Sequence, residues 1–494
     1  MYSSKYNLVF PINDVENVIL NPLSGAIDLF DNTAIILLNH SNRADVAERY
    51  SNFLDYCKNR GYAYHEPSQE KEKLLRFENL FNEALRQQPL QFTLYVTHMC
   101  NLRCSYCFQG HSEHNDNTLV STNVINAMFK TIVTFKEKMN NFRPPVVSLF
   151  GGEPLLKSGK HWSTIEEILK LCREYDCQIE IVTNGVNLEY YVPLLSKYVI
   201  KEIMVTLDGP RHIHDMRRVF ADGSGTFDKI VAGIDSALRK KIPIMLRVNV
   251  DNENIESLPE LADFILAKEW LNYGLCVTIG FVNDAGQTCC ENEDNSPLEN
   301  KSPNGKPVGP EHMCNAESVK LDSLKKFLEI KSKNEKMDFM LSNSRFISFF
   351  EYLAKNGKLP LPITKFCHTN RGNQFSLSLL GNFFTCCCMN GCSLNEYETG
   401  RFYPTLQLNE IILEDFISRD ITKLSLCSQC SIALLCGGGC TRLVLQNGKR
   451  LKCDNVCPPM ANMDYIQVLA DYYMPKIIEK FNLQKNGAIR SVEI

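Results

Sequence analysis

Several features that mark other classes of protein are missing from this sequence of 494 residues. No stretch approaches eighteen uninterrupted apolar residues, so no membrane-spanning helix is expected. The formal net charge of −4 leaves no broad basic field for nucleic-acid phosphates or an anionic membrane. The N-terminal residues also lack a basic segment followed by an apolar core, the pattern of a secretory signal. We therefore expect a cytoplasmic protein with no nucleic-acid or membrane partner.

Cysteine, by contrast, is abundant: there are 21 residues, many of them crowded into residues 100–107 and 367–457. A disulfide scaffold is typical of short secreted chains, whereas clustered thiols in a large cytosolic chain more often bind metal or act in catalysis. Cys57, Cys172 and Cys177 stand alone in helix-like or strand-edge patterns, which indicates packing residues. The two clusters are interpreted as metal sites.

The apolar pattern predicts an α/β chain of four parts. Residues 1–90 predict a hairpin, two helices and a short strand, a winged-helix-like module. Residues 91–285 alternate strands with amphipathic helices and predict a partial (β/α)6 barrel of parallel strands. Residues 286–360 predict a flexible loop and a helical bridge, and residues 361–494 a cysteine-rich domain covered by a closing helix.

The carboxyl ends of the predicted barrel strands carry the chemically distinctive residues. Because sites of parallel barrels lie at these ends, the residues are expected to share one opening. The predicted strands are residues 91–97, 146–152, 179–185, 202–209, 244–250 and 276–282.

Three cysteines, Cys100, Cys104 and Cys107, follow the first barrel strand in the spacing C-x-x-x-C-x-x-C. Three thiolates hold a zinc ion if a fourth ligand joins them, and His98 and His111 are candidates for that ligand. Three thiolates also hold three irons of a [4Fe–4S] cluster, whose fourth iron then stays open to another ligand. The spacing by itself leaves both interpretations open.

With Tyr106 before the last cysteine, the loop resembles the C-x-x-x-C-x-aromatic-C element of the radical S-adenosylmethionine (SAM) superfamily. The resemblance implies that SAM chelates the fourth iron and that an electron from the cluster cleaves the bound SAM. The resulting 5′-deoxyadenosyl radical abstracts hydrogen from a substrate. The protein binds and orients the reactants and excludes competing reactions.

Later strand ends resemble the SAM-binding elements of the same family. Gly151, Gly152 and Glu153 begin a GGEP element, in which glycine allows close backbone approach and the carboxylate is expected to receive the SAM ammonium. Arg247 stands on a buried strand and needs an anionic partner, either the SAM carboxylate or a protein carboxylate. The resemblance implies that five further residues line the site: Thr183, Asn184, Thr206, Asp208 and Asn249.

The C-terminal cysteines resemble the SPASM domain of radical SAM enzymes that modify peptides and proteins, which carries two auxiliary [4Fe–4S] clusters. The stretch CSQCSIALLCGGGC contains one C-x2-C pair, whereas a zinc ribbon uses two. The resemblance implies a first auxiliary cluster on Cys367, Cys386 and Cys440. It implies a second on Cys427, Cys430 and Cys436, closed by Cys453 or Cys457.

Three functions are considered. The favoured one is a peptide maturase that binds the leader of a ribosomally made precursor peptide on residues 1–90 and installs a crosslink, with a thioether as the favoured bond. It requires SAM, its [4Fe–4S] cluster, two auxiliary clusters and a reductant such as flavodoxin or ferredoxin. The second is a sulfatase-maturating enzyme that makes formylglycine and needs no leader-binding module. The third is a non-catalytic metal-binding protein.

No residue beyond the clusters and SAM is assigned a catalytic role. Residues 208–230, DGPRHIHDMRRVFADGSGTFDKI, resemble the peptide-modifying branch of the family. His212, His214 and Arg217 in this stretch are expected either to line the substrate channel or to lie on the surface.

Overall fold

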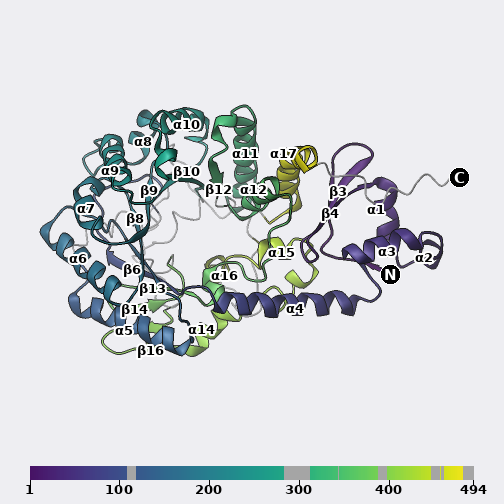
Figure 1. Cartoon of the computed structure of the whole chain (residues 1–494), viewed down its shortest axis with the longest axis horizontal. Coiled ribbons are helices and arrows are strands. Elements are labelled where there is room, and N and C mark those ends of the chain that lie inside the picture. The colour runs from purple at the N-terminus through teal and green to yellow at the C-terminus, as the bar shows by residue number, and fades with distance from the viewer. Residues whose placement is uncertain are drawn as a thin grey trace. The chain divides into compact units, whose positions relative to one another are not determined.

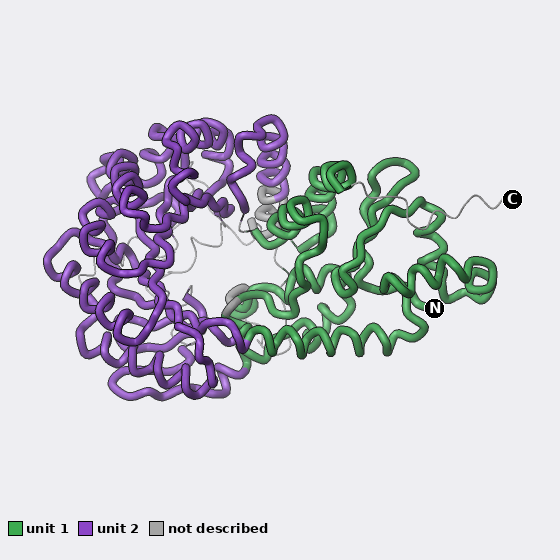
Figure 2. Tube along the Cα trace, in the orientation of Figure 1, with its two compact units in different colours: residues 1–85, 344–371, 415–494 green, residues 86–343, 372–414 purple. Residues whose placement is uncertain are grey.

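A computed structural model describes residues 1–107, 118–282, 312–342, 344–387, 398–446, 457 and 461–481. The chain forms two compact units, neither of them continuous in sequence (Figure 2). Unit 1 comprises residues 1–85, 344–371 and 415–494, and unit 2 comprises residues 86–343 and 372–414. None of the helices described has the combination of length and apolar character that a bilayer span requires.

Six neighbouring parallel strands in chain order form the centre of unit 2 (Figure 1). They confirm the predicted partial barrel, and their bounds differ from the predicted ones by three residues at most. The strands are β6 (Gln91–Thr97), β7 (Val146–Gly151), β8 (Gln178–Thr183), β9 (Ile200–Thr206), β10 (Ile244–Val250) and β11 (Cys276–Phe281).

Amphipathic helices lie outside these strands (Figure 1). In α9, Ile230, Ile234 and Leu238 recur every fourth residue and are buried, which is the periodicity of one helix face. The helices of unit 2 are α5 (Thr122–Lys138), α6 (Gly159–Glu174), α7 (Leu188–Leu195), α8 (Arg211–Arg217), α9 (Phe227–Arg239), α10 (Leu258–Ala267) and α11 (His312–Ser332). Short 3₁₀ turns cover Ile255–Ser257, Trp270–Tyr273 and Glu335–Met337.

Further strands extend the sheet at both edges. β12 (Met340–Ser342) pairs in parallel with β11, and β13 (Gln374–Leu377) pairs in parallel with β6. Antiparallel pairs then add β14 (Asn382–Phe384), β15 (Gly400–Arg401) and β16 (Gln407–Leu408). The flexible loop expected in the first part of residues 286–360 lies mostly outside the described residues.

The N-terminal part of unit 1 contains a three-stranded antiparallel sheet of β2 (Leu8–Pro11), β3 (Glu16–Asn21) and β4 (Ala26–Asp31). The hairpin expected near residue 22 joins β3 to β4. The single helix expected over residues 43–61 is divided at Tyr50, whose φ and ψ are not helical. The remaining elements are β1 (Tyr2–Ser3), α1 (Asn32–Asn39), α2 (Ala44–Arg49), α3 (Ser51–Arg60) and β5 (Ala63–Tyr64), which pairs with β1.

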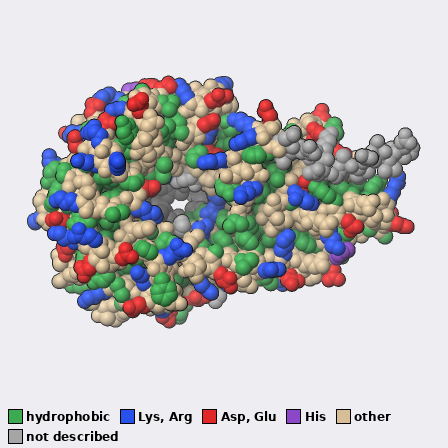
Figure 3. All heavy atoms as spheres, in the orientation of Figure 1, with side chains coloured by type: hydrophobic (Ala, Val, Ile, Leu, Met, Phe, Trp, Pro, Cys, Tyr) green, Lys and Arg blue, Asp and Glu red, His purple; other side chains and the backbone are tan. Residues whose placement is uncertain are grey.

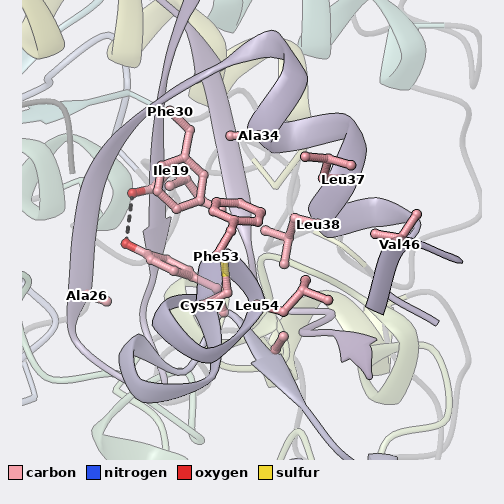
Figure 4. Packing of buried hydrophobic residues seen from close by; sticks show 12 residues of the cluster. Ile19, Ala26, Phe30, Ala34, Leu37, Leu38, Val46, Phe53, Leu54 and Cys57 are labelled. Atoms are coloured by element: carbon pink, nitrogen blue, oxygen red, sulfur yellow. Dashed lines mark hydrogen bonds between the residues drawn. The ribbon is translucent and has the colours of Figure 1, made fainter. Parts of the chain in front are cut away.

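One hydrophobic core holds these N-terminal elements together (Figure 4). The ring centroids of Phe30 and Phe53 lie 5.5 Å apart, and Leu38 and Leu54 are 1% exposed. Cys57 is fully buried in the same core, as expected for a packing cysteine.

A second core in unit 1 joins the N-terminal residues to the cysteine-rich segment near the C-terminus. Tyr6, Leu23 and Leu74 belong to the same cluster of buried side chains as Leu424 and Cys427. Leu74 comes from α4 (Pro67–Arg86), a helix that was not predicted although apolar residues recur at helical spacing from Leu74 to Leu85. The N-terminal module and the cysteine segment thus fold as parts of one unit.

Short helices and one long helix complete the cysteine-rich part. The predicted closing helix is present as α17 (Met463–Phe481), and it packs on α12 (Arg345–Asn356) through stacked Phe350 and Tyr473 rings. The short helices are α13 (His368–Arg371), α14 (Glu410–Ile417), a 3₁₀ turn at Cys427–Gln429, α15 (Ala433–Cys436) and α16 (Thr441–Gln446).

Candidate active site and cysteine clusters

Cys100, Cys104 and Cys107 lie in the loop after β6, at the carboxyl edge of the parallel strands. The Cys107 N–H donates to the Cys104 carbonyl at 3.2 Å, and Cys100 Sγ accepts the Leu102 N–H at 3.4 Å. Burial, with smaller contributions from Glu153 and the two other thiols, raises the pKa of Cys100 to about 12. The thiols are thus close enough to repel one another as thiolates, and a positively charged partner would stabilise that form.

No three His, Cys, Asp or Glu side chains within the described ranges are placed to hold a single metal ion. His111, one candidate for a fourth zinc ligand, lies outside those ranges.

The two glycines of the GGEP element approach the backbone that leads into the cysteine loop. The Gly152 N–H donates to the Thr97 carbonyl at 2.9 Å, and a Cβ at Gly152 would lie 2.2 Å from the His98 carbonyl oxygen. Gly151 has a φ of 138°, which a residue with a Cβ rarely adopts. The close approach predicted for these glycines is therefore made to residues 97–99.

Glu153 joins the ends of β7 and β8. Its Oε1 atom accepts hydrogen bonds from the Leu155 N–H at 2.8 Å and from Thr183 Oγ1 at 2.6 Å, and its Oε2 atom accepts the Asn184 N–H at 2.6 Å. The side chain is almost fully buried, and this burial raises the pKa of Glu153 while the three hydrogen bonds oppose the rise. A carboxylate has about four acceptor positions, so one remains for a further donor such as an ammonium group.

Tyr106 and Asp208 form the centre of a buried polar network. The Tyr106 hydroxyl donates to the Asp208 carboxylate and accepts hydrogen bonds from Arg218 Nη1 at 2.8 Å and Asn249 Nδ2 at 3.2 Å. The Asn249 N–H donates to Asp208 Oδ1 at 2.9 Å. This network connects the cysteine loop to the ends of β9 and β10.

Two residues expected on the surface or in a channel are buried behind this network. His214 is fully buried, and Arg217 forms ion pairs with Asp251 at 2.7 Å and Glu253 at 2.9 Å. His212 is exposed, as the surface interpretation predicted. His214 and Arg217 therefore lie in the protein interior next to Asp208 and help to hold it in place. Arg218 was not predicted at all, since nothing in its spacing distinguishes it.

Arg247 lies on β10 opposite Thr206 of β9. Its Nε atom donates to Asn249 Oδ1 at 3.0 Å, and among the described residues no carboxylate forms an ion pair with it. Burial lowers the pKa of Arg247, which the nearby Asp208 partly opposes. Gly280 on β11 leaves room for the guanidinium, because a Cβ there would lie 1.8 Å from Nη2. A partly buried cation of this kind fits a ligand carboxylate.

The C-terminal cysteines fall into two groups. Burial, followed by Cys436, Cys430 and Cys457, raises the pKa of Cys427 to about 12, so these four thiols lie near one another in unit 1. Cys367 and Cys440 lie near Arg345 in the same unit.

Cys386 belongs to unit 2 and follows β14, next to Cys387, whose carbonyl accepts a hydrogen bond from the Tyr95 hydroxyl. Cys453 lies outside the described residues.

Comparison with known proteins finds a family model that matches the central part of the chain. Residues 94–265 match the model of the Radical SAM superfamily. The chain is 25% identical over 171 residues to the Fe-coproporphyrin III synthase of Methanosarcina barkeri (strain Fusaro / DSM 804), which covers 34% of this chain and 39% of that protein. It is 28% identical over 161 residues to the GTP 3′,8-cyclase of Clostridium perfringens (strain 13 / Type A), over 31% and 43% of the two chains. The chain thus spans less than half the length of these two relatives.

Two solved structures align with larger parts of the chain. The structure described as native anSMEcpe with bound AdoMet has a TM-score of 0.56 at 18% identity, covering 80% of this chain and 99% of that one. Streptococcus suis SuiB bound to precursor peptide SuiA has a TM-score of 0.49 at 14% identity, covering 92% and 99%. The first similarity shows that the fold is shared.

Proposed function

We propose that this chain, in which residues 94–265 form a radical SAM domain, is a radical SAM oxidoreductase that matures a ribosomally made precursor peptide by installing a crosslink, with a thioether as the favoured bond. The observation that carries the proposal is the composition of unit 1, where a three-stranded module shares a core with a segment of clustered thiols. Among the described residues, β2 and β4 each pair only with β3, and an outer strand of this kind suits an extended leader peptide, which adds to the sheet as a further strand. The similar fold of anSMEcpe, which has been crystallised with bound AdoMet and a Kp18Cys peptide, supports a peptide substrate.

The residues of unit 2 suit the cofactors of this family. Cys100, Cys104 and Cys107 would hold a [4Fe–4S] cluster with one open iron for SAM. Arg247 would bind the SAM carboxylate, and the remaining acceptor position of Glu153 would bind the ammonium. When bound, SAM and the cluster supply the one-electron chemistry that removes a hydrogen atom from the substrate.

We assign the second auxiliary [4Fe–4S] cluster to Cys427, Cys430, Cys436 and Cys457. Cys457 is preferred to Cys453 because it lies close enough to Cys427 and Cys436 to influence the pKa of both thiols. Cys367 and Cys440 of unit 1 are the proposed ligands of the first auxiliary cluster, and Cys386 stays a prediction from the sequence.

Closing a thioether between a carbon radical and a cysteine thiol forms one C–S bond and releases one proton and one electron. The electron needs a one-electron acceptor, and iron–sulfur centres belong to that class. A separate reductant such as flavodoxin or ferredoxin would supply the electron that starts each turnover, in the cytoplasm.

The test uses the full chain with reconstituted iron and sulfide, SAM, dithionite and a cysteine-containing precursor peptide. Mass spectrometry is expected to show 5′-deoxyadenosine and a peptide that has lost two hydrogens and one free thiol. The core peptide alone is expected to react poorly, and adding the leader as a separate peptide is expected to restore turnover.

A product that reacts with hydrazide reagents would instead identify formylglycine and the sulfatase-maturating alternative. Full turnover of the core without any leader would exclude leader recognition. Bound zinc with no SAM cleavage would support a non-catalytic metal-binding protein.

A further inference from the structure

Two arginines in the cysteine-rich part of unit 1 have no carboxylate partner among the described residues. Arg345 and Arg371 are half-buried, and neither forms an ion pair in the described part of the chain. The Nε atom of Arg371 is fully buried and has no hydrogen-bond partner there. Burying a cation is costly unless an anion compensates its charge. A negative charge nearby would therefore stabilise both guanidinium groups.

Arg345 joins the two groups of cysteines. Its Nη1 atom donates to the Cys436 carbonyl at 3.1 Å, and its Nη2 atom donates to the carbonyl of Phe366, the residue before Cys367. The guanidinium also lies over the Phe366 ring, 4.4 Å from its centroid. One side chain therefore ties a ligand of the proposed second cluster to the neighbour of a ligand of the first.

Thiols from both proposed ligand sets lie near Arg345. Cys436, Cys367 and Cys440 are close enough to act electrostatically on its guanidinium. Cys367 also lies near Arg371. The protein thus places cations beside thiols drawn from both proposed ligand sets, an arrangement that would stabilise an anionic iron–sulfur cluster.

We propose that Arg345 is a shared counter-charge for the two auxiliary clusters and raises the reduction potential of both. This proposal rests on the assignment of auxiliary clusters made above. A nearby positive charge favours the reduced form of a cluster, because reduction adds one negative charge. Arg345 is a positioning residue in this role.

The experiment uses the full chain with Cys100, Cys104 and Cys107 replaced by alanine, so that only auxiliary clusters are loaded. About eight irons per chain are expected from two clusters of four. A redox titration followed by electron paramagnetic resonance then compares Arg345→Gln, which keeps hydrogen-bond donors without the charge, with Arg345→Lys, which keeps the charge. Arg49→Gln, an exposed site in the same unit, removes one positive charge as a control.

Arg345→Gln is expected to lower the ratio of reduced to oxidised cluster at least tenfold at a fixed potential, about 59 mV for a one-electron couple, in both signals. Arg345→Lys and Arg49→Gln are expected to stay close to the parent chain. Loss of iron in Arg345→Gln with retention in Arg345→Lys would also support a role of the charge.

Unchanged potentials in a fully loaded Arg345→Gln would overturn the proposal, as would equal shifts in Arg345→Gln and Arg345→Lys. Absence of iron from the parent chain would instead overturn the auxiliary clusters themselves, so the two failures are distinguishable.

Discussion

The backbone N–H of Asp208 donates to the Nδ1 atom of His214 at 3.2 Å. Nδ1 is therefore unprotonated, so the proton of the neutral ring lies on Nε2 and points to Thr226 Oγ1 at 3.0 Å. The Thr226 hydroxyl in turn donates to the Arg218 carbonyl at 2.6 Å. This chain of donors holds the backbone of Asp208 and Arg218, two of the three residues that hydrogen-bond to the Tyr106 hydroxyl.

His214 is expected to make unit 2 less stable in mild acid. Burial, followed by the charges of Arg218 and Arg217, lowers the pKa of His214 well below its usual value of 6.5. The unfolded chain therefore binds an extra proton below pH 6.5, and stability falls as the pH falls, by about 1.4 kcal/mol at pH 5.5. Thermal unfolding between pH 7.5 and 5.5 should show a smaller loss for His214→Asn than for the parent chain.

His212→Asn, on the same helix but exposed, is the matched control and should follow the parent chain. An identical pH dependence of His214→Asn and the parent chain would contradict the neutral, buried state of His214.

Replacing Gly152 with alanine should disturb the cysteine loop. The added Cβ would lie 2.2 Å from the His98 carbonyl oxygen and 2.3 Å from that of Met99, and neither backbone atom moves easily. Overpacking of this kind costs about 1–3 kcal/mol, and iron retained at Cys100, Cys104 and Cys107 is expected to fall. In Gly159→Ala, the matched control, the new Cβ meets no atom within 4 Å, and iron content should not change. Equal iron content in both variants would show that the loop tolerates the displacement.

Removing Arg217 should destabilise unit 2 strongly. Its side chain is 3% exposed and lies near the fully buried carboxylate of Asp208, while also pairing with Asp251. Taking one partner from a buried ion pair costs about 3–5 kcal/mol, so Arg217→Met should lower the denaturant midpoint markedly. Glu253→Gln removes the exposed partner of the same arginine and should have little effect. The prediction fails if the two variants unfold at the same denaturant concentration.

Arg247→Gln is expected to weaken SAM binding while leaving iron content unchanged. A hydrogen bond to a charged group contributes about 1.5–3 kcal/mol, which corresponds to a loss of roughly 10- to 150-fold in affinity. Equilibrium dialysis with the reconstituted protein measures this loss. Arg239→Gln, at the exposed end of α9, is the control for the change in net charge. Unaltered affinity in Arg247→Gln would assign the SAM carboxylate to another residue.

The sequence predicted the barrel well because the six strands are short apolar runs separated by amphipathic helices, a local pattern. The cysteine loop and the glycines of the GGEP element were also local, since each is contained in a short stretch of sequence that resembles a family element. The pairing of Tyr106 with Asp208 was not predictable in this way, because 102 residues separate the two side chains and no periodicity relates them. Helix α4 was missed although apolar residues recur at helical spacing from Leu74 to Leu85 in its second half; only Leu74 and Leu85 of its twenty residues are buried.

Leu74 should stabilise the cysteine-rich segment, although it belongs to the N-terminal module. It is 6% exposed and shares a core with Leu424, Cys427 and Leu434, more than 300 residues away in sequence. Replacing a buried leucine with alanine costs about 2–5 kcal/mol, so Leu74→Ala should loosen the segment that holds Cys427 and Cys430. Hydrogen exchange of residues 421–436 should therefore become faster.

Leu80→Ala, on the same helix but 57% exposed, should leave that exchange unchanged. Faster exchange in both variants would indicate a general loosening of α4, and unchanged exchange in Leu74→Ala would refute the shared core.

A deletion of residues 1–85 does not test leader binding alone, because the deletion would also expose apolar side chains around Cys427. Loss of peptide binding in that deletion would combine a lost leader site with a damaged cysteine segment. Point variants such as Leu74→Ala and Leu80→Ala separate the effect on the cysteine segment from the loss of a leader site, because each leaves the rest of the N-terminal module in place.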